Sequence, residues 1–305
     1  MYLFLVNIVR GCLFSIFICS LCLADNPYHK PETIDLIIVA GQSNAVGFDT
    51  FVDQLPPSPI DQDVHFWWRC GAPPPDSYDS TSDNQWLTLT TQPQKSPNQD
   101  RLQRTQDGNF HHLQGGFGPE IGLARTLRRL QPQQPLAVIK VAFNGTSITA
   151  WLSRPQKGEF NCYTALICEI KKALAQALEK GIIFHLRALV WVQGESDGNE
   201  VYAADYKNNL LHMIKTLKKD LDAPDLIVLL GFNTRFKNGC AAIRKIVKAQ
   251  KDIAQQDIHI TYVDSSECEL ANGVHFSSKG TLKLGRLFGQ KLLQTEKILA
   301  SSTNK

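Results

Sequence analysis

The sequence contains no long basic run and no arginine-rich stripe, although Lys and Arg outnumber Asp and Glu by 32 to 29. A nucleic-acid-binding surface is therefore not expected. After residue 24, the sequence also lacks a CxxC pair and the Cys/His spacing of a zinc site. After residue 24, no apolar segment approaches the roughly 20 residues that span a bilayer. What remains is a globular chain of 305 residues whose 43% hydrophobic content can bury a sizeable core.

The first 24 residues have the pattern of a secretory signal peptide. Arg10 precedes an apolar stretch at residues 11–23, and Ala24 supplies a small residue before a cleavage point. This stretch of about 13 residues is too short for a membrane anchor. The sequence therefore predicts a secreted or periplasmic protein with no stable membrane insertion after signal removal. Residues 25–305 are expected to form a single domain.

The cysteines and histidines of the mature chain suggest no cofactor or metal. The five cysteines that follow the signal are compatible with one or two disulfides in an oxidising compartment, but their pairing cannot be read from the sequence. His111 and His112 form the only adjacent histidine pair. Because no third ligand lies nearby in the sequence, we interpret this pair as part of a loop rather than as a metal site.

Short β-rich apolar runs alternate with amphipathic stretches, a pattern typical of a parallel sheet with helices on both faces. The candidate strands are residues 34–40, 136–142, 186–192, 226–230 and 258–263. The candidate helices are residues 119–130, 163–180, 202–221, 240–255 and 278–299. The pattern predicts an α/β fold, a three-layer α/β/α sandwich of the flavodoxin-like type with five parallel strands.

Residues 51–116 break this alternation. The segment is rich in Pro, Asp, Ser, Gln and Thr, with only short candidate strands at residues 64–68 and 86–90. A segment of this length inside a domain usually carries function. Too few apolar residues cluster in it to form a second core, so we interpret it as a long insertion within the single domain.

Three polar groups are expected to meet at one edge of the sheet. Ser43 follows the first candidate strand, at the carboxyl edge where open α/β folds bind ligands. The third strand ends close to Glu195, and His275 lies on a Gly-containing turn before the last helix. A serine becomes a nucleophile when a base takes its proton and a third group orients that base. Ser43 alone would equally well cap a helix, but the three groups together favour a nucleophile.

Five motifs in this order resemble the SGNH hydrolases, and more closely their sialate O-acetylesterase and acetylxylan esterase branch, carbohydrate esterase family six. They are GQSNA at 41–45, GFGPEIGLA at 116–124, NGTSITAW at 144–151, WVQGESD at 191–197 and GVHFSSKGTLKLG at 273–285. The resemblance implies that Ser43 is the nucleophile and His275 the general base, and that no cofactor is needed. It also implies an oxyanion hole formed by the Ser43 N–H, Gly118 and a polar side chain, either Gln193 or Asn144.

The most serious departure from the family pattern is Asn272, which stands where the family usually has an Asp three residues before the histidine. Glu195 is the nearest expected carboxylate on the same sheet edge. We predict that Glu195 orients His275, with Asn272 as a geometric helper, and that Glu195→Gln costs at least about a hundredfold in kcat. Asp197 and Asp264 are weaker candidates because each is placed to cap a neighbouring turn.

The resulting hypothesis is an exported serine esterase whose partner is an acetylated carbohydrate. Trp67, Trp68 and Trp86 in the insertion, and Trp151 after the NGT turn, are candidates to stack on a sugar ring, with the insertion forming a wall of the site. A lipase or thioesterase of the same fold is an alternative, but it would need an apolar acyl tunnel. A carbohydrate-binding protein without turnover is another, because Asn272 carries no charge to stabilise an imidazolium.

Overall fold

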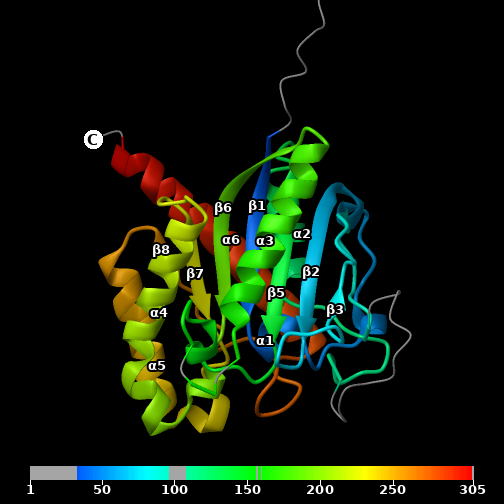
Figure 1. The fold of residues 1–305 in the computed structure, drawn as a ribbon. Helices are drawn as coiled ribbons and strands as arrows, with labels where there is room; N and C mark the ends of the chain where they lie inside the picture. Colours follow the sequence, from blue (N-terminus) through cyan, green and yellow to red (C-terminus); the bar gives the residue numbers. More distant parts are fainter. Residues whose placement is uncertain (1–32, 96–107, 156, 159, 304–305) are drawn as a thin grey trace, which may run out of the picture. The chain divides into compact units, whose positions relative to one another are not determined.

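The structure, a computed structural model, describes residues 33–303 except for 96–107, 156 and 159 (Figure 1). The expected signal peptide at residues 1–24 lies outside the described residues. The strands are β1 Thr33–Gly41, β2 Val64–Gly71, β3 Ser80–Thr81, β4 Leu87–Thr88, β5 Leu136–Phe143, β6 Ile183–Val192, β7 Ile227–Gly231 and β8 Ile260–Tyr262. The helices are α1 Ser43–Val46, α2 Glu120–Leu130, α3 Cys162–Glu179, α4 Glu200–Asp220, α5 Ala241–Gln256 and α6 Ser278–Thr303.

The strands form one sheet in the order β3-β2-β5-β1-β6-β7-β8, and β4 also pairs with β2. The strands β2, β5, β1, β6, β7 and β8 are parallel to their neighbours along this path. Every residue of β5 and of β7 is buried, as expected for parallel strands covered on both faces. Without β2, the parallel strands follow the flavodoxin-like order 2-1-3-4-5.

Helices cover both faces of the sheet (Figure 1). Apolar side chains of α3, α4 and α5 pack on one face in one hydrophobic cluster. Those of α1, α2 and α6 pack on the other face in a second cluster. The expected three-layer α/β/α architecture is therefore confirmed.

The expected number of parallel strands was wrong, because the 51–116 segment contributes a sixth. Residues 64–71 form β2, which pairs with β5 over its whole length. The sequence VHFWWRCG shows little alternation of apolar and polar residues, the usual pattern of a strand. Phe66, Trp67 and Trp68 follow one another and are all buried. The short strands β3 and β4 then pair with β2 in the antiparallel sense. Part of the expected loop is therefore an extension of the sheet.

Two further features concern cysteines and membranes. Cys70, Cys162, Cys168, Cys240 and Cys268 are all free thiols, so none of them forms the disulfides that the sequence permitted. Within the described part of the chain, no helix has both the length and the hydropathy that crossing a membrane requires.

Candidate active site

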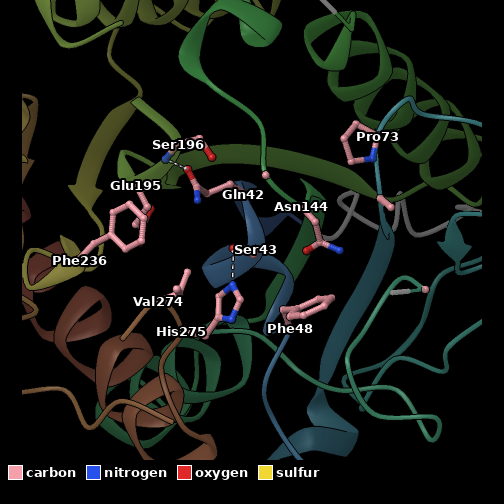
Figure 2. Close-up of a pocket in the computed structure, with 13 residues that line it drawn as sticks. Gln42, Ser43, Phe48, Pro73, Asn144, Glu195, Ser196, Phe236, Val274 and His275 are labelled. Atoms are coloured by element: carbon pink, nitrogen blue, oxygen red, sulfur yellow. Dashed lines mark hydrogen bonds between the residues drawn. The ribbon is translucent and has the colours of Figure 1, made fainter. Parts of the chain in front are cut away.

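Ser43 begins α1, directly after β1 reaches the carboxyl edge of the sheet. The turn depends on Gly41, whose φ of +142° places it so close to β6 that an added Cβ would lie 2.1 Å from the Val192 carbonyl oxygen. The ends of the adjacent strands β1 and β6 therefore meet with almost no gap. Ser43 is only 5% exposed and lies on the wall of a pocket at this edge (Figure 2).

His275 reaches Ser43 from a loop that precedes α6. An isolated bridge between Leu270 and Phe276 closes this loop. Within it, the side-chain Oδ1 of Asn272 accepts hydrogen bonds from the backbone N–H groups of Val274 and His275, each at 2.8 Å. The His275 Nε2 lies 3.0 Å from the Ser43 Oγ, within reach for transfer of a proton (Figure 2).

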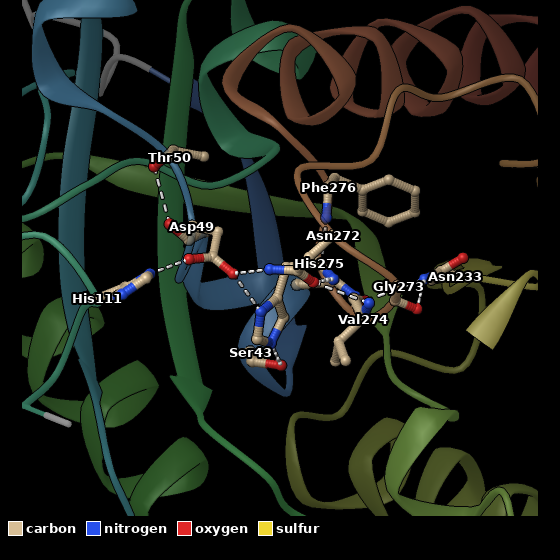
Figure 3. Close-up of polar contacts among 12 residues, drawn as sticks. Ser43, Asp49, Thr50, His111, Asn233, Asn272, Gly273, Val274, His275 and Phe276 are labelled. Carbon is tan, nitrogen blue, oxygen red and sulfur yellow. Dashed lines mark hydrogen bonds and ion pairs between the residues drawn. The ribbon is translucent and has the colours of Figure 1, made fainter. Parts of the chain in front are cut away.

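The carboxylate that contacts His275 is Asp49, which the sequence analysis did not consider. Its Oδ2 lies 2.5 Å from the His275 Nδ1. The Asn272 Nδ2 donates a second hydrogen bond to the same oxygen, at 2.7 Å (Figure 3). Asp49 reaches this position because Gly47 ends α1 in the left-handed conformation, with a φ of +83°, and turns the chain back beside the nucleophile. Ser43, His275 and Asp49 therefore form a continuous hydrogen-bonded line.

The prediction that Glu195 orients His275 is wrong. The Glu195 Oε1 instead accepts hydrogen bonds from the Asn44 Nδ2 at 2.6 Å and the Asn233 N–H at 2.8 Å. Both asparagines also donate from their side chains to the Val274 carbonyl oxygen. Glu195 thus holds the two residues that support the histidine loop, and it contacts His275 only through them.

The weaker candidates for the acid also lie elsewhere. Asp264 is exposed, and its carboxylate accepts the Ser266 N–H in a local turn. Asp197 is fully buried and accepts hydrogen bonds from the Gln193 Nε2 and the Ile148 N–H. Asp264 therefore caps a local turn as expected, whereas Asp197 connects its loop to Ile148, a distant part of the chain.

The expected oxyanion-hole residues divide into two groups. Gly118 donates its N–H to the Glu120 Oε1 at 2.8 Å, so this donor is already committed. Gln193 is fully buried, and its Nε2 donates to the Thr146 carbonyl oxygen and to Asp197. Ser43 and Asn144 line the pocket, as does Gly145, which the sequence analysis did not single out. One Asn144 amide proton goes to the Asn109 carbonyl oxygen at 3.0 Å, which leaves its second proton for a ligand.

The expected sugar-stacking role of the tryptophans is wrong, because none of the four lines the pocket. Trp67, Trp68 and Trp151 are between 0% and 3% exposed. Each indole N–H is used internally, by Glu169, Ser80 and Thr146 respectively. Trp86 is half-buried and donates to the Ala173 carbonyl oxygen. These four tryptophans therefore pack in the interior of the protein rather than in the site.

The pocket beside Ser43 and His275 has a volume of about 380 Å³. Phe48 and Phe236 supply its aromatic surface, and Gln42, Asn144 and Ser196 supply polar groups (Figure 2). The 51–116 insertion contributes Ala72, Pro73 and Gly108, so it forms part of the wall through small residues and a proline. This combination of apolar surface with a few convergent polar groups is typical of small-molecule sites.

The pKa values of the two carboxyl groups near the pocket, Asp49 and Glu195, are shifted in opposite directions. Burial alone would raise the pKa of Asp49, but hydrogen bonds from His275, His111 and Asn272 outweigh it and hold this pKa below its ordinary value. Burial raises the pKa of Glu195, and its hydrogen bonds from Asn233 and Asn44 offset only part of this effect. Asp49 is therefore the better group to stay ionised beside an imidazole.

Comparison with known proteins shows the family of this chain. The family described as carbohydrate esterase, sialic acid-specific acetylesterase matches residues 33–294. The chain belongs to this family. A probable carbohydrate esterase of Arabidopsis thaliana is 25% identical over 182 residues, which cover 58% of this chain and 64% of that relative's length.

Solved structures confirm the α/β fold class of this carbohydrate esterase family member. A protein from Arabidopsis thaliana superposes with a TM-score of 0.59 at 20% identity, covering 87% of this chain and 98% of that one. NanS superposes with a TM-score of 0.58 at 17% identity, covering 88% and 98%. A carbohydrate acetylesterase from Xanthomonas citri gives 0.51 at 15% identity, covering 82% and 54%.

Sequence reasoning missed two residues of the site in this esterase family member, Asp49 and Asn44. Asn44 lies inside the GQSNA motif and connects α1 to the histidine loop, because its Oδ1 accepts the Phe276 N–H while its Nδ2 donates to Val274 and Glu195. Two features of the sequence could have drawn attention to Asp49: it is an acid, and it lies six residues after the nucleophile, just beyond Gly47. Neither feature predicts a contact with His275 without the fold, because 226 residues separate the two.

Proposed function

We propose that this chain is an exported serine esterase that removes O-acetyl groups from a carbohydrate through an acetyl-serine intermediate. The observation that carries the proposal is the hydrogen-bonded line from the Ser43 Oγ through His275 to the Asp49 carboxylate. Export rests on the signal-like residues 1–24. The family match and the acetylesterase among the structural neighbours support the choice of an acetyl group on a carbohydrate.

The first half of the reaction follows from the positions of these atoms. The Ser43 Oγ attacks the acetyl carbonyl carbon while the His275 Nε2 takes the serine proton. The Asp49 carboxylate stabilises the imidazolium and holds the His275 Nδ1 proton, which sets the tautomer. Collapse of the tetrahedral intermediate breaks the ester bond. His275 then returns the proton to the departing sugar oxygen.

The second half uses the same groups in reverse. His275 takes a proton from water as the water oxygen attacks the acetyl-Ser43 carbonyl. Acetate leaves, and the proton returns to the Ser43 Oγ. In both halves the negative oxygen needs preorganised donors, for which we propose the backbone N–H groups of Ser43 and Gly145 and the Asn144 amide, all on the pocket wall.

The pocket favours a sugar ester over the alternatives. Its volume of about 380 Å³ is small for a lipase or thioesterase, which would hold a long acyl chain. Phe48 and Phe236 offer flat apolar surface for a sugar ring, and Gln42 and Ser196 offer polar contacts for its hydroxyls. The reason for a binding protein without turnover was the missing charge at Asn272, and Asp49 supplies a charge beside His275.

Hydrolysis of p-nitrophenyl acetate by the purified mature chain tests this function. Ser43→Ala should abolish turnover, and mass spectrometry of the acid-quenched parent reaction should find an acetyl group on the Ser43 peptide. Turnover by Ser43→Ala equal to that of the parent would exclude Ser43 as the nucleophile. A folded parent that hydrolyses neither this ester nor acetylated oligosaccharides would favour the binding-protein alternative.

The role of the aromatic pocket wall is tested separately with Phe236→Ala. We expect a larger loss of kcat/KM on an acetylated oligosaccharide than on p-nitrophenyl acetate, because only the sugar extends across this surface. Trp86→Phe, which alters an aromatic that does not line the pocket, is the control and should affect both substrates equally. Equal losses on the two substrates with Phe236→Ala would contradict the assignment.

A further inference from the structure

Asp49 has a second neighbour on the side away from His275. Its Oδ1 is hydrogen-bonded to the His111 Nδ1, so the carboxylate lies between two imidazoles (Figure 3). His112 follows directly in the chain, and its ring stacks on that of His111 with centroids 4.8 Å apart. Asp49, His111 and His112 each offer one ligand atom, and these three atoms lie within 4.8 Å of one another. The fold thus supplies the third donor that the sequence around the histidine pair lacks.

The chemistry of these donors suits a divalent transition metal. One carboxylate oxygen and two imidazole nitrogens are ligand types that Zn²⁺ takes. The His112 Nε2 is buried and has no hydrogen-bond partner among the described residues. A buried nitrogen without a partner is costly, and a metal would relieve that cost. His111 is 63% exposed at its side chain, which provides an entry path.

We propose that Asp49, His111 and His112 form a binding site for a divalent transition metal such as Zn²⁺, and that occupancy of this site inhibits the esterase. Tetrahedral coordination at 2.0–2.1 Å places ligand atoms about 3.3 Å apart. The three donor atoms lie within 4.8 Å of one another, so their separations must close by at most about 1.5 Å. Side-chain rotation of the two histidines supplies this movement. Water completes the coordination.

Inhibition follows from the shared carboxylate and therefore rests on the proposed function. Asp49 uses Oδ1 toward the metal site and Oδ2 toward His275. A cation on Oδ1 withdraws the negative charge that stabilises the His275 imidazolium when Ser43 gives up its proton. The metal also competes with the hydrogen bond that His111 makes to Asp49. The loss should fall on kcat, because neither histidine of the pair lines the substrate pocket.

The binding half is tested without activity, by titrating Zn²⁺ against a chromogenic chelator in the presence of the mature chain. Ser43→Ala should bind one equivalent like the parent, which separates this site from the proposed function. His111→Gln and His112→Gln should each weaken binding at least tenfold. His185→Gln is the matched control, because His185 is 64% exposed at its side chain and also faces an aspartate, Asp35. Binding that is absent, or is equal in His111→Gln, His112→Gln and the parent, would overturn the site.

The inhibitory half is tested by the ratio of rates with and without Zn²⁺ in each protein. In the parent, Zn²⁺ should lower kcat at least tenfold, and a chelator should restore it. The same ratio should approach one in His112→Gln. Stoichiometric binding with an unchanged parent rate would contradict the inhibition. Equal inhibition in the parent and in His112→Gln would place the inhibitory metal elsewhere, for example on His275.

Discussion

The role of Asp49 is the feature that single-residue substitutions test most directly. Asp49→Asn keeps the shape of the side chain but removes the charge beside His275, and its amide can present N–H to the imidazole and select the wrong tautomer. We expect kcat on p-nitrophenyl acetate to fall at least about a hundredfold, since the equivalent change costs about 10⁴ in serine proteases. Asp264→Asn, at an exposed turn, is the control and should retain the parent rate. Activity of Asp49→Asn within tenfold of the parent would exclude Asp49 as the orienting acid.

Glu195 should behave differently from Asp49 in both activity and stability. Glu195→Gln should remain within about tenfold of the parent kcat, because the amide oxygen can still accept from Asn44 and Asn233. Burial raises the pKa of Glu195 above its ordinary 4.5, so the native state binds this proton more tightly than the unfolded chain does. The stability that the protonated carboxyl contributes below pH 4.5 is lost as pH rises toward the folded pKa.

The pH dependence of Tm measures this effect of Glu195. The Tm of Glu195→Gln relative to the parent should increase between pH 4 and pH 8, because the variant has no carboxyl to ionise. A difference in Tm that is constant over this range would mean that burial does not perturb this group. A hundredfold loss of kcat in Glu195→Gln would show that the carboxylate charge is needed after all.

At the scale of secondary-structure elements, Asn44 connects α1 to the loop that carries His275. Asn44→Ala removes the acceptor of the Phe276 N–H and the donor to Glu195, leaving buried polar groups without partners. We expect a loss of about 1–3 kcal/mol in the free energy of unfolding, together with a loss of kcat, because the loop no longer holds His275 against Ser43. Urea unfolding and steady-state kinetics measure the two effects.

Asn199→Ala provides the matched control for Asn44→Ala. Asn199 caps α4, accepting the Tyr202 N–H at 3.0 Å, so its loss should cost roughly 1 kcal/mol of stability. It does not contact the histidine loop, and kcat should be unchanged at a temperature where the variant is folded. If both variants lose kcat to the same extent, the effect reflects general destabilisation rather than the connection made by Asn44.

At the same scale, the alternating pattern located the five helices and the five flavodoxin-like strands because periodicity is a local property of a segment. This reasoning found only part of β2, as a short candidate strand at residues 64–68, and did not place it in the parallel sheet. Its Trp67 and Trp68 point to opposite faces of the sheet, yet both are buried. A strand covered on both faces shows no alternation, and the surrounding polar loop obscured its short apolar run.

At the scale of the whole molecule, a buried ion pair joins separate layers beneath the site. Lys140, in the middle of β5, donates to the Glu120 Oε1 of α2, the Val46 carbonyl oxygen of α1 and the Gln92 side chain of the insertion. Lys140 and Glu120 are both 0% exposed. Lys140→Met should lower the free energy of unfolding by about 3–5 kcal/mol, because it leaves the Glu120 charge buried without a partner.

Urea unfolding of Lys140→Met, of Glu120→Gln and of the double variant measures this coupling. The double variant should be more stable than Lys140→Met, since it removes the unpaired carboxylate. Additive losses would mean that the two groups do not interact energetically. The uncharged pair should also loosen the attachment of the insertion through Gln92.

The sequence by itself determined the layers of the fold, and also Ser43 and His275 as candidates for nucleophile and base. The carboxyl ends of parallel strands lie at one edge of the sheet, so the residues after β1 and β6 had to lie on that edge. That argument locates the backbone but not the side chains. It correctly placed the motifs that directly follow strands. It also placed Glu195 correctly on that edge, but without saying which atom its carboxylate would face.

Only the tertiary structure decided which carboxylate contacts His275. Asp49 and His275 are 226 residues apart, and their contact depends on how Gly47 turns the chain and how the Asn272 loop folds over it. A hydrogen bond requires an oxygen within about 3 Å in the right direction. An error of one side-chain rotamer exceeds that tolerance, and no periodic pattern encodes such a position. The acid, the fate of the Gly118 N–H and the burial of the tryptophans were therefore decided by packing in three dimensions.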